Sequence, residues 1–292
     1  LSALPQQTVS TPRCSFLQYP LNLMKYTDTH LSLLSQVSLP SLVATLAALV
    51  FLAFAVPQEA VGQECFAVAN FGGWENPSTW AGDRQNTTSC SGPGGVPGSS
   101  NKATVIDGNT ITIGDNANIQ VGQIEIESGS TLDGRQAAFN TTGSITVADD
   151  GDPSTDANGN VTIATGATLK LKNVTEYDID IGGEFNNSGT VEARGREITV
   201  GGLLVNNSGA TFDISNSKLT IEDGDLTNNS TGWQDAGGSV VFTNTLPPTD
   251  PVTPQVLDFS TGEISTLKVA ETEKMTLQLN SSVTVNELVF DN

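Results

Sequence analysis

The residues with the clearest potential for chemistry are the oxygen-bearing side chains of segment 149–160, DDGDPSTDANGN. Their carboxylate and amide groups alternate, as they do in loops that bind calcium through oxygen ligands. The segment departs from an EF-hand, because no glutamate closes the loop and Pro153 interrupts it. Two interpretations stay open, a calcium site and an unliganded surface loop. The calcium ligands would be Asp150, Asp152, Asp156, Asn158 and Asn160.

Thiol chemistry is the second possibility. Residues 24–62 are interpreted below as a secretory leader. Cys65 and Cys90 are the only cysteines that follow this leader, and Cys14 lies before it. The single histidine, His30, also lies in that leader, so no imidazole remains to activate a thiolate. Two cysteines in an exported protein usually pair. The sequence therefore predicts a Cys65–Cys90 disulfide and no catalytic thiol.

Acid–base chemistry has weak candidates. Lyases and hydrolases that cleave polysaccharides can use aspartate pairs or basic residues with calcium. The chain has no phosphate-binding glycine loop and no Gly-x-Ser-x-Gly motif. Charged residues on successive coils usually form a solvated face, so we expect no catalytic residues. The charged clusters in question are Arg194 and Arg196 with Glu192 and Glu197, and Asp178 with Asp180.

Trp74 and Trp80 lie inside the predicted disulfide loop and have two interpretations. Two neighbouring indole rings can form a platform on which a sugar stacks. Alternatively, both rings are buried and, with Phe71, cover the apolar end of the fold. An open stack of strands needs such a cover, because an exposed strand edge invites self-association. The second interpretation is favoured.

The elements that must position these residues are set by a repeat in segment 179–233. Asn-Asn pairs begin at Asn186, Asn206 and Asn228, so the period is about 20 residues. Each copy contains short apolar strands, a glycine corner and the Asn-Asn pair. No copy can bury its own apolar side chains, so successive copies must stack as a β-solenoid. The asparagines either form hydrogen-bonded ladders inside the coils or occupy left-handed turn positions.

Eight apolar-x-apolar triplets extend this pattern over most of the chain. Their spacing suits one strand per turn of a coil, with both outer residues inward and the central residue outward. The predicted fold is therefore all-β, a single-stranded right-handed parallel β-helix with an N-terminal disulfide and tryptophan cap. The triplets begin at Ile111, Ile124, Ile145, Val161, Ile179, Ile198, Leu219 and Val240. The predicted core of the central repeat is Ile198, Val200, Leu203, Val205, Phe212 and Ile214.

The segment that precedes these coils carries a family resemblance. It contains Gly73-Trp74, Thr79-Trp80 and Val96-Pro97-Gly98, followed by a strand pair at 105–111. This pattern resembles the opening of β-solenoid domains on surface proteins of Bacteroidetes-type bacteria, and is similar to the extracellular domain named for its eight glycines. Segments 238–242 and 277–290 resemble later coils of the same proteins. The resemblance implies fold and surface location but no particular activity.

Export is predicted from the N-terminal region. Residues 42–56 form an apolar run that is short for a membrane span, and small residues precede Gln63. Residues 24–62 are therefore interpreted as a signal peptide, with a retained anchor helix as the alternative. Residues 1–23 would precede the true start, or be unstructured.

The remaining boundaries follow from composition. Residues 63–104 are expected to form the N-terminal cap and residues 105–245 the coils. The proline-rich stretch 246–255 is expected to be a loop, and 256–292 to form further, incomplete solenoid strands of a longer protein.

The charge balance restricts the partners. The chain has 32 acidic and 12 basic residues, a net charge of −20, and removal of the leader leaves this value unchanged. Nucleic acid and anionic lipid need basic patches, so neither is expected as a partner. A surface polysaccharide or another cell-surface protein remains as the expected partner.

We expect a non-catalytic, secreted or cell-surface module that spaces or presents other domains. The alternatives are a carbohydrate-binding or polysaccharide-processing β-helix and a calcium-dependent surface-layer or biofilm component. Calcium is the only cofactor considered.

Overall fold

The computed structural model describes residues 64–114, 117–134, 142–148, 158–171, 176–244, 254–270 and 275–291. All of them belong to one unit of the chain, Glu59–Asn292. The predicted signal peptide lies outside the described residues. Apart from the short 3₁₀ turns η2 (Pro77–Thr79) and η3 (Pro93–Gly95), the regular elements described are β-strands. None of the described residues forms a helix that is long and apolar enough to cross a membrane.

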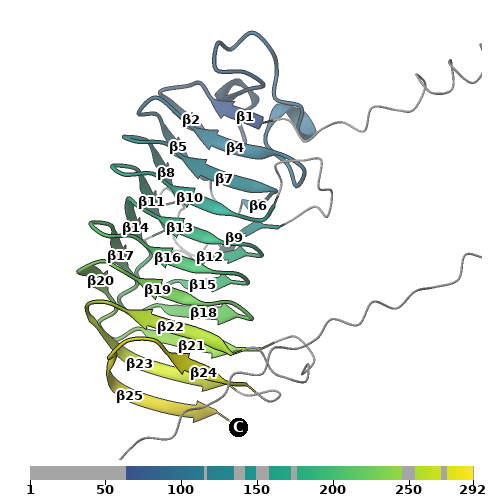
Figure 1. Ribbon diagram of the computed structural model, residues 1–292. Helices are drawn as coiled ribbons and strands as arrows, with labels where there is room; N and C mark the ends of the chain where they lie inside the picture. Colours follow the sequence, from purple (N-terminus) through teal and green to yellow (C-terminus); the bar gives the residue numbers. More distant parts are fainter. Residues whose placement is uncertain are drawn as a thin grey trace, which may run out of the picture. The chain divides into compact units, whose positions relative to one another are not determined.

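The strands are stacked in coils, and the complete coils contribute one strand to each of three sheets (Figure 1). The neighbours within each sheet are parallel, except that β1 and β3 are antiparallel. Sheet A contains β1 (Glu64–Ala67), β3 (Trp80–Ala81), β4 (Lys102–Val105), β7 (Gln123–Ile126), β10 (Val161–Ile163), β13 (Phe185–Asn187), β16 (Leu204–Asn206), β19 (Leu226–Asn228), β22 (Gln255–Phe259) and β24 (Leu277–Leu279). Sheet B contains β2 (Phe71–Gly73), β5 (Thr110–Thr112), β8 (Thr131–Asp133), β11 (Thr168–Lys170), β14 (Thr190–Glu192), β17 (Thr211–Asp213) and β20 (Gly232–Gln234). Sheet C contains β6 (Asn118–Val121), β9 (Thr142–Val147), β12 (Glu176–Ile181), β15 (Glu197–Val200), β18 (Lys218–Glu222), β21 (Ser239–Thr243), β23 (Glu263–Ala270) and β25 (Thr284–Asp291).

The expectation of one strand per turn is wrong. The eight apolar triplets are spread over all three sheets: one lies at β5 in sheet B, two form β7 and β10 in sheet A, and five lie in sheet C. Corners of only a few residues let three short strands fit into one coil of about 20 residues. Some neighbouring triplets in the sequence therefore lie in different sheets, whereas others lie in the same sheet of successive coils. Their spacing alone does not give the length of a coil.

The core is built from files of side chains that lie above one another in successive coils. Because side chains alternate along a strand, each strand sends every second residue into the interior. One file runs through all nine coils of sheet A; every member before the last is at most 1% exposed, whereas the last, Leu279, is 55% exposed. Its members in order are Cys65, Ala103, Ile124, Val161, Phe185, Leu204, Leu226, Leu257 and Leu279.

The predicted core of the central repeat needs one correction. Ile198, Val200, Phe212 and Ile214 are fully buried. Leu203 and Val205 are only partly buried and are not core residues, because Leu204 and Asn206 occupy the inward positions of β16. A shift of one residue exchanges the two faces of a strand, and here the apolar LLV run concealed the register.

The buried position next to Leu204 belongs to an asparagine ladder. Asn187 Nδ2 donates to Asn206 Oδ1 and Asn206 Nδ2 donates to Asn228 Oδ1, both at 2.8 Å. All three side chains are fully buried. Of the two interpretations of these residues, the ladder is therefore the observed one. The pairs do not stack member for member, because the second asparagine of the first pair lies over the first of the other two.

The corners between sheets C and A require glycine because the backbones of successive coils lie very close together there. A Cβ atom on Gly224 would lie 1.9 Å from the carbonyl oxygen of Gly202 in the coil before it. A Cβ on Gly202 would likewise lie 2.8 Å from Gly183 O. The backbones of successive coils thus approach too closely at this corner for any side chain.

We expect Gly224→Ala to lower the free energy of unfolding by about 3 kcal/mol, because the rigid backbone below cannot move away. Gly195→Ala is the control, since Gly195 has φ of +73° but open space around its Cβ position. That variant should cost about 1 kcal/mol for the left-handed conformation alone. Urea unfolding of both variants measures the difference. Equal losses would show that the corner is not crowded.

Candidate functional site

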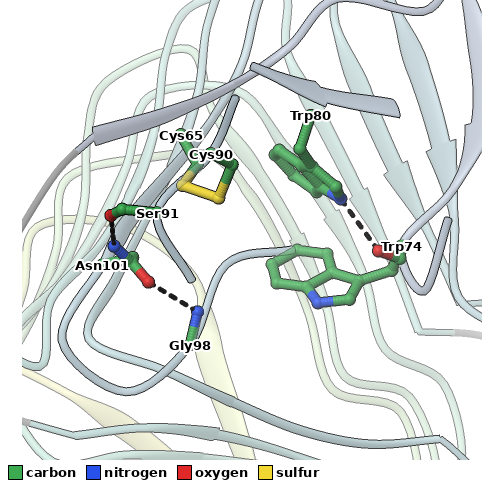
Figure 2. The surroundings of a disulfide bond; sticks show 7 residues. All are labelled: Cys65, Trp74, Trp80, Cys90, Ser91, Gly98 and Asn101. Carbon is green, nitrogen blue, oxygen red and sulfur yellow. Dashed lines mark hydrogen bonds between the residues drawn. A yellow bond between two sulfur atoms is a disulfide. The ribbon is translucent and has the colours of Figure 1, made fainter. Parts of the chain in front are cut away.

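The N-terminal end of the coils contains the disulfide that the sequence predicts. Cys65 in β1 is bonded to Cys90, with Cα atoms 5.2 Å apart, and both side chains are buried (Figure 2). Residues 74–101, which contain η2, β3 and η3, leave the first coil after β2 and return at β4. The bond ties this excursion to the interior of the first coil.

Replacing both cysteines by alanine should lower the free energy of unfolding by about 3 kcal/mol, because the unfolded chain regains the freedom of a 25-residue loop. Denaturant unfolding of the oxidised protein and the variant measures the loss. Mass spectrometry of the natural protein without reduction should find the two peptides linked. Free thiols at both positions would contradict the assignment.

The two tryptophans pack on each other rather than presenting a flat surface. Their ring centroids are 4.9 Å apart at an interplanar angle of 67°, and Trp80 Nε1 donates to Trp74 O at 2.8 Å (Figure 2). Each residue is only 3% exposed. A sugar stacks on an open aromatic face, and neither ring offers one. Phe71 was expected to be buried with the two tryptophans, and this expectation is wrong. Phe71 is 84% exposed on the outer side of β2 and covers none of the core.

The excursion contacts the first strands of sheets A and B. In sheet A, β3 pairs antiparallel with β1, through Phe66–Ala81 and Ala67–Trp80. Beside sheet B, the buried Thr79 packs so closely on Gly72 that a Cβ there would lie 2.4 Å from Thr79 Oγ1. Glycine at this position thus permits the contact.

A cleft of about 380 Å³ lies beside the third sheet, between the excursion and β6. Trp74, Val96 and Ile119 form apolar parts of its wall. Glu75 is an exposed acid on its rim, and its Oε1 accepts from Gly114 N at 3.1 Å. The remaining lining residues are Pro93, Pro97, Gly98, Ser99, Ala117, Asn118 and Gln120. The cleft combines a hydrophobic wall with a few polar groups, as binding sites commonly do.

Two further charged groups at this end of the chain, Lys102 in β4 and Asp83 in the excursion, have defined partners. Lys102 Nζ lies 3.1 Å from Glu64 and 2.6 Å from Glu125, its partners in the strands on either side. Burial alone would lower the pKa of Lys102, but the hydrogen bonds that its ammonium donates to both carboxylates outweigh burial, and the pKa is raised. The pKa of Asp83 is held well below its usual range by hydrogen bonds from Thr87, Thr88 and Gln85.

The predicted calcium ligands are only partly placed. Asp150, Asp152 and Asp156 lie outside the described residues. Asn160 Oδ1 accepts from Glu184 N at 2.7 Å, and Asn158 Oδ1 accepts from Asn160 N at 3.3 Å. Both side-chain oxygens thus have a structural role. Within the described parts of the chain, no group of three or more His, Cys, Asp or Glu side chains is arranged to hold a metal ion.

The charged clusters considered for catalysis are divided among separate contacts. Arg194 pairs with Asp213, and Lys218 pairs with Glu197. Burial would raise the pKa of Asp213, but hydrogen bonds from Arg194 and Ser215 hold it below its usual value. Each pair joins two successive coils, so these charges are engaged in holding the stack together.

The other charged residues considered for catalysis, and the nearby Glu222, also lie in separate environments. Asp178 Oδ1 accepts from Glu197 N at 3.1 Å, again between coils. Arg196 is buried, whereas Glu192 is partly exposed. Burial, together with Asp180 and Asp223, raises the pKa of Glu222 on the outer side of sheet C. The contacts described here do not assemble an acid–base pair in a cleft.

Comparison of the chain with models of known protein families, with curated protein sequences and with solved structures finds no match. The cleft beside β6 is therefore the candidate site that rests on geometry. Sequence reasoning missed it, although the Val96-Pro97-Gly98 motif and Trp74 both line it.

Proposed function

We propose that this chain is a non-catalytic, secreted or cell-surface structural module, a stiff β-solenoid that spaces or presents other domains. The observation that supports it is the file of core residues that continues through eight coils from Cys65 to Leu257. A core that passes from coil to coil without interruption leaves no joint at which the stack could bend. Stiffness of this kind is what a spacer requires.

The excursion 74–101 serves as an N-terminal cap in this proposal. It pairs one strand edge, packs on a second and is fixed by a disulfide. Covered edges keep an exported solenoid from joining its neighbours edge to edge. The coil is expected to be right-handed, as crossovers between parallel strands almost always are. The buried tryptophans weaken the case for a sugar-binding platform.

The proposal is tested by measuring how stiffly the two ends of the stack are held. Spin labels on Gln85 and Ser282, both exposed, place one probe at each end. Pulsed electron resonance should give one narrow distance distribution for a rigid spacer. A broad or bimodal distribution would contradict the proposal.

The surface location is tested separately. An epitope inserted at the exposed Gly94 should be accessible to antibody on intact cells of the source organism, and retention inside the cell would contradict the surface location.

A further inference from the structure

Sheet C begins one coil later than the other two sheets. The first coil supplies β1 to sheet A and β2 to sheet B, whereas β6 of the second coil is the outermost strand of sheet C at this end (Figure 1). After β2 the chain enters the excursion 74–101 instead of forming a third strand. No described strand therefore occupies the position beside β6 that a complete first coil would fill.

The backbone of β6 shows which of its groups face β9. Ala117 O accepts from Ser144 N, and Val121 O accepts from Ala148 N. Both donors belong to the chain at β9, with which β6 pairs in parallel. In a parallel pair, successive residues direct their N–H and C=O groups to opposite edges of the strand. The odd-numbered residues of this segment therefore bond towards β9.

The even-numbered residues face the other edge. Asn118 and Gln120 direct their backbone N–H and C=O groups towards the cleft, and both residues line it. Just beyond β6, the N–H of Gly122 donates to Asn101 O of the excursion at 3.0 Å. The excursion thus meets this edge at its far end, beyond Asn118 and Gln120.

The walls of the cleft suit a strand that has one apolar face. Trp74 and Val96 line the cleft; Trp74 also belongs to the buried core, and the partly buried Val96 packs against it. Glu75 supplies a negative charge at the rim, and no basic side chain is among the lining residues. A peptide that carries a lysine or arginine is therefore favoured over an acidic one.

We propose that the cleft beside β6 binds an extended peptide of a partner protein. The peptide adds to sheet C as a further strand, pairs with the backbone of Asn118 and Gln120, places apolar side chains against Trp74 and Val96, and places a basic side chain near Glu75. Addition of a strand to an open sheet edge is a recurrent mode of peptide recognition. The site does not depend on the structural role proposed above, because it rests on the edge of β6 and on the residues that line the cleft.

The test uses the full chain, labelled for NMR, and a capped probe peptide of about six residues that alternates valine and threonine and ends in lysine. Binding should slow hydrogen exchange of the Asn118 and Gln120 amides by about tenfold or more at saturation. The Ile119 amide, which faces β9, serves as the internal reference and should change little. Unchanged exchange at Asn118 and Gln120 at millimolar peptide would overturn the proposal.

Two variants at one position separate strand addition from other binding. Gln120→Pro removes the N–H that faces the cleft and leaves the bonds to β9 intact, so an edge strand tolerates it. It should weaken peptide binding by about tenfold or more, whereas Gln120→Val keeps the N–H and should bind within about twofold of the natural chain. Equal binding by the proline and valine variants would overturn strand addition. If Gln120→Pro does not fold, the exchange measurement on the natural chain decides alone.

The charge and the class of ligand are tested separately. Glu75→Gln should weaken the lysine peptide by about threefold and leave a peptide that ends in leucine unchanged. Equal effects on both peptides would remove the basic side chain from the proposal. A chito-oligosaccharide is the competing probe. If it slows exchange at Asn118 and Gln120 while the peptide does not, the cleft is a saccharide site and the proposal is wrong.

Discussion

Val200→Asp is expected to lower the free energy of unfolding by about 3–5 kcal/mol, a large part of the stability of an ordinary domain. Val200 is fully buried, and its neighbours in register are Ile181 in the coil before and Ile221 in the coil after. Ile181 and Ile221 are also fully buried. A carboxylate there has no described partner among these apolar side chains, so the cost of removing its charge from water is not offset.

Thr199→Asp is the matched control, because it introduces the same side chain one residue earlier on the same strand. Thr199 is partly exposed and lies in register between Asp180 and Thr220. The new carboxylate would face Asp180 across neighbouring strands, and a like-charge pair of this kind costs up to about 1 kcal/mol. Thermal and urea unfolding of both variants measure the difference. Similar losses would mean that β15 does not alternate between core and solvent, and the assigned register would have to be abandoned.

This contrast depends on the part of the fold that the sequence predicts best. Ile198 and Val200 belong to an apolar-x-apolar triplet next to a glycine corner, and such triplets define both the strand and its inward face. The disulfide was equally predictable, because only Cys65 and Cys90 remain after the predicted leader and no geometry is needed to pair them. Where local pattern and tertiary packing agree, one sequence suffices.

The register of β16 could not be predicted in the same way. In LLVNN, two apolar residues compete for the inward position, and alternation alone favours either face. The structure selects Leu204, because Asn206 two residues later must meet Asn187 and Asn228 in the ladder. That choice is made by contacts between coils about 20 residues apart, which no local pattern contains.

The cleft beside β6 was unpredictable for a related reason. Its existence depends on a strand that the first coil lacks and on the path of the excursion around Val96. The segment contains Gly92, Gly94, Gly95 and Gly98. Glycine permits many backbone paths. Composition therefore indicates a loop there but leaves its course undetermined.

The asparagine ladder leads to the second large expected effect. Asn206 accepts one hydrogen bond from Asn187 and donates one to Asn228, and all three residues are fully buried. Asn206→Asp keeps the size of the side chain but turns a donor into a second acceptor that faces Asn228 Oδ1. A buried carboxylate in this position is expected to lower the free energy of unfolding at pH 7 by about 3–5 kcal/mol.

The neighbouring asparagine provides the control. Asn207 is only partly buried, and its Nδ2 donates to Asn186 Oδ1 at 2.6 Å and Ser188 Oγ at 3.0 Å on the outer side of sheet A. Asn207→Asp also loses its donor, but water can solvate the new charge. The expected cost is therefore about 1 kcal/mol, as for a typical exposed hydrogen bond.

The sign of the pH dependence distinguishes the ladder from simple crowding. Burial raises the pKa of the new carboxyl in the folded state above its unfolded value of about 3.9. The penalty is therefore fully present above the folded pKa, shrinks as the pH falls towards about 4, and is gone below the unfolded pKa, where both states hold the proton. A protonated acid restores the ladder, because its carbonyl accepts from Asn187 and its hydroxyl donates to Asn228. The difference in stability between the Asn206→Asp and Asn207→Asp variants should thus narrow by at least half between pH 7 and about pH 4. A gap that stays constant over this range would show that the carboxyl at position 206 is not buried as an ion, and the ladder would not be the interaction that sets the register of the central coils.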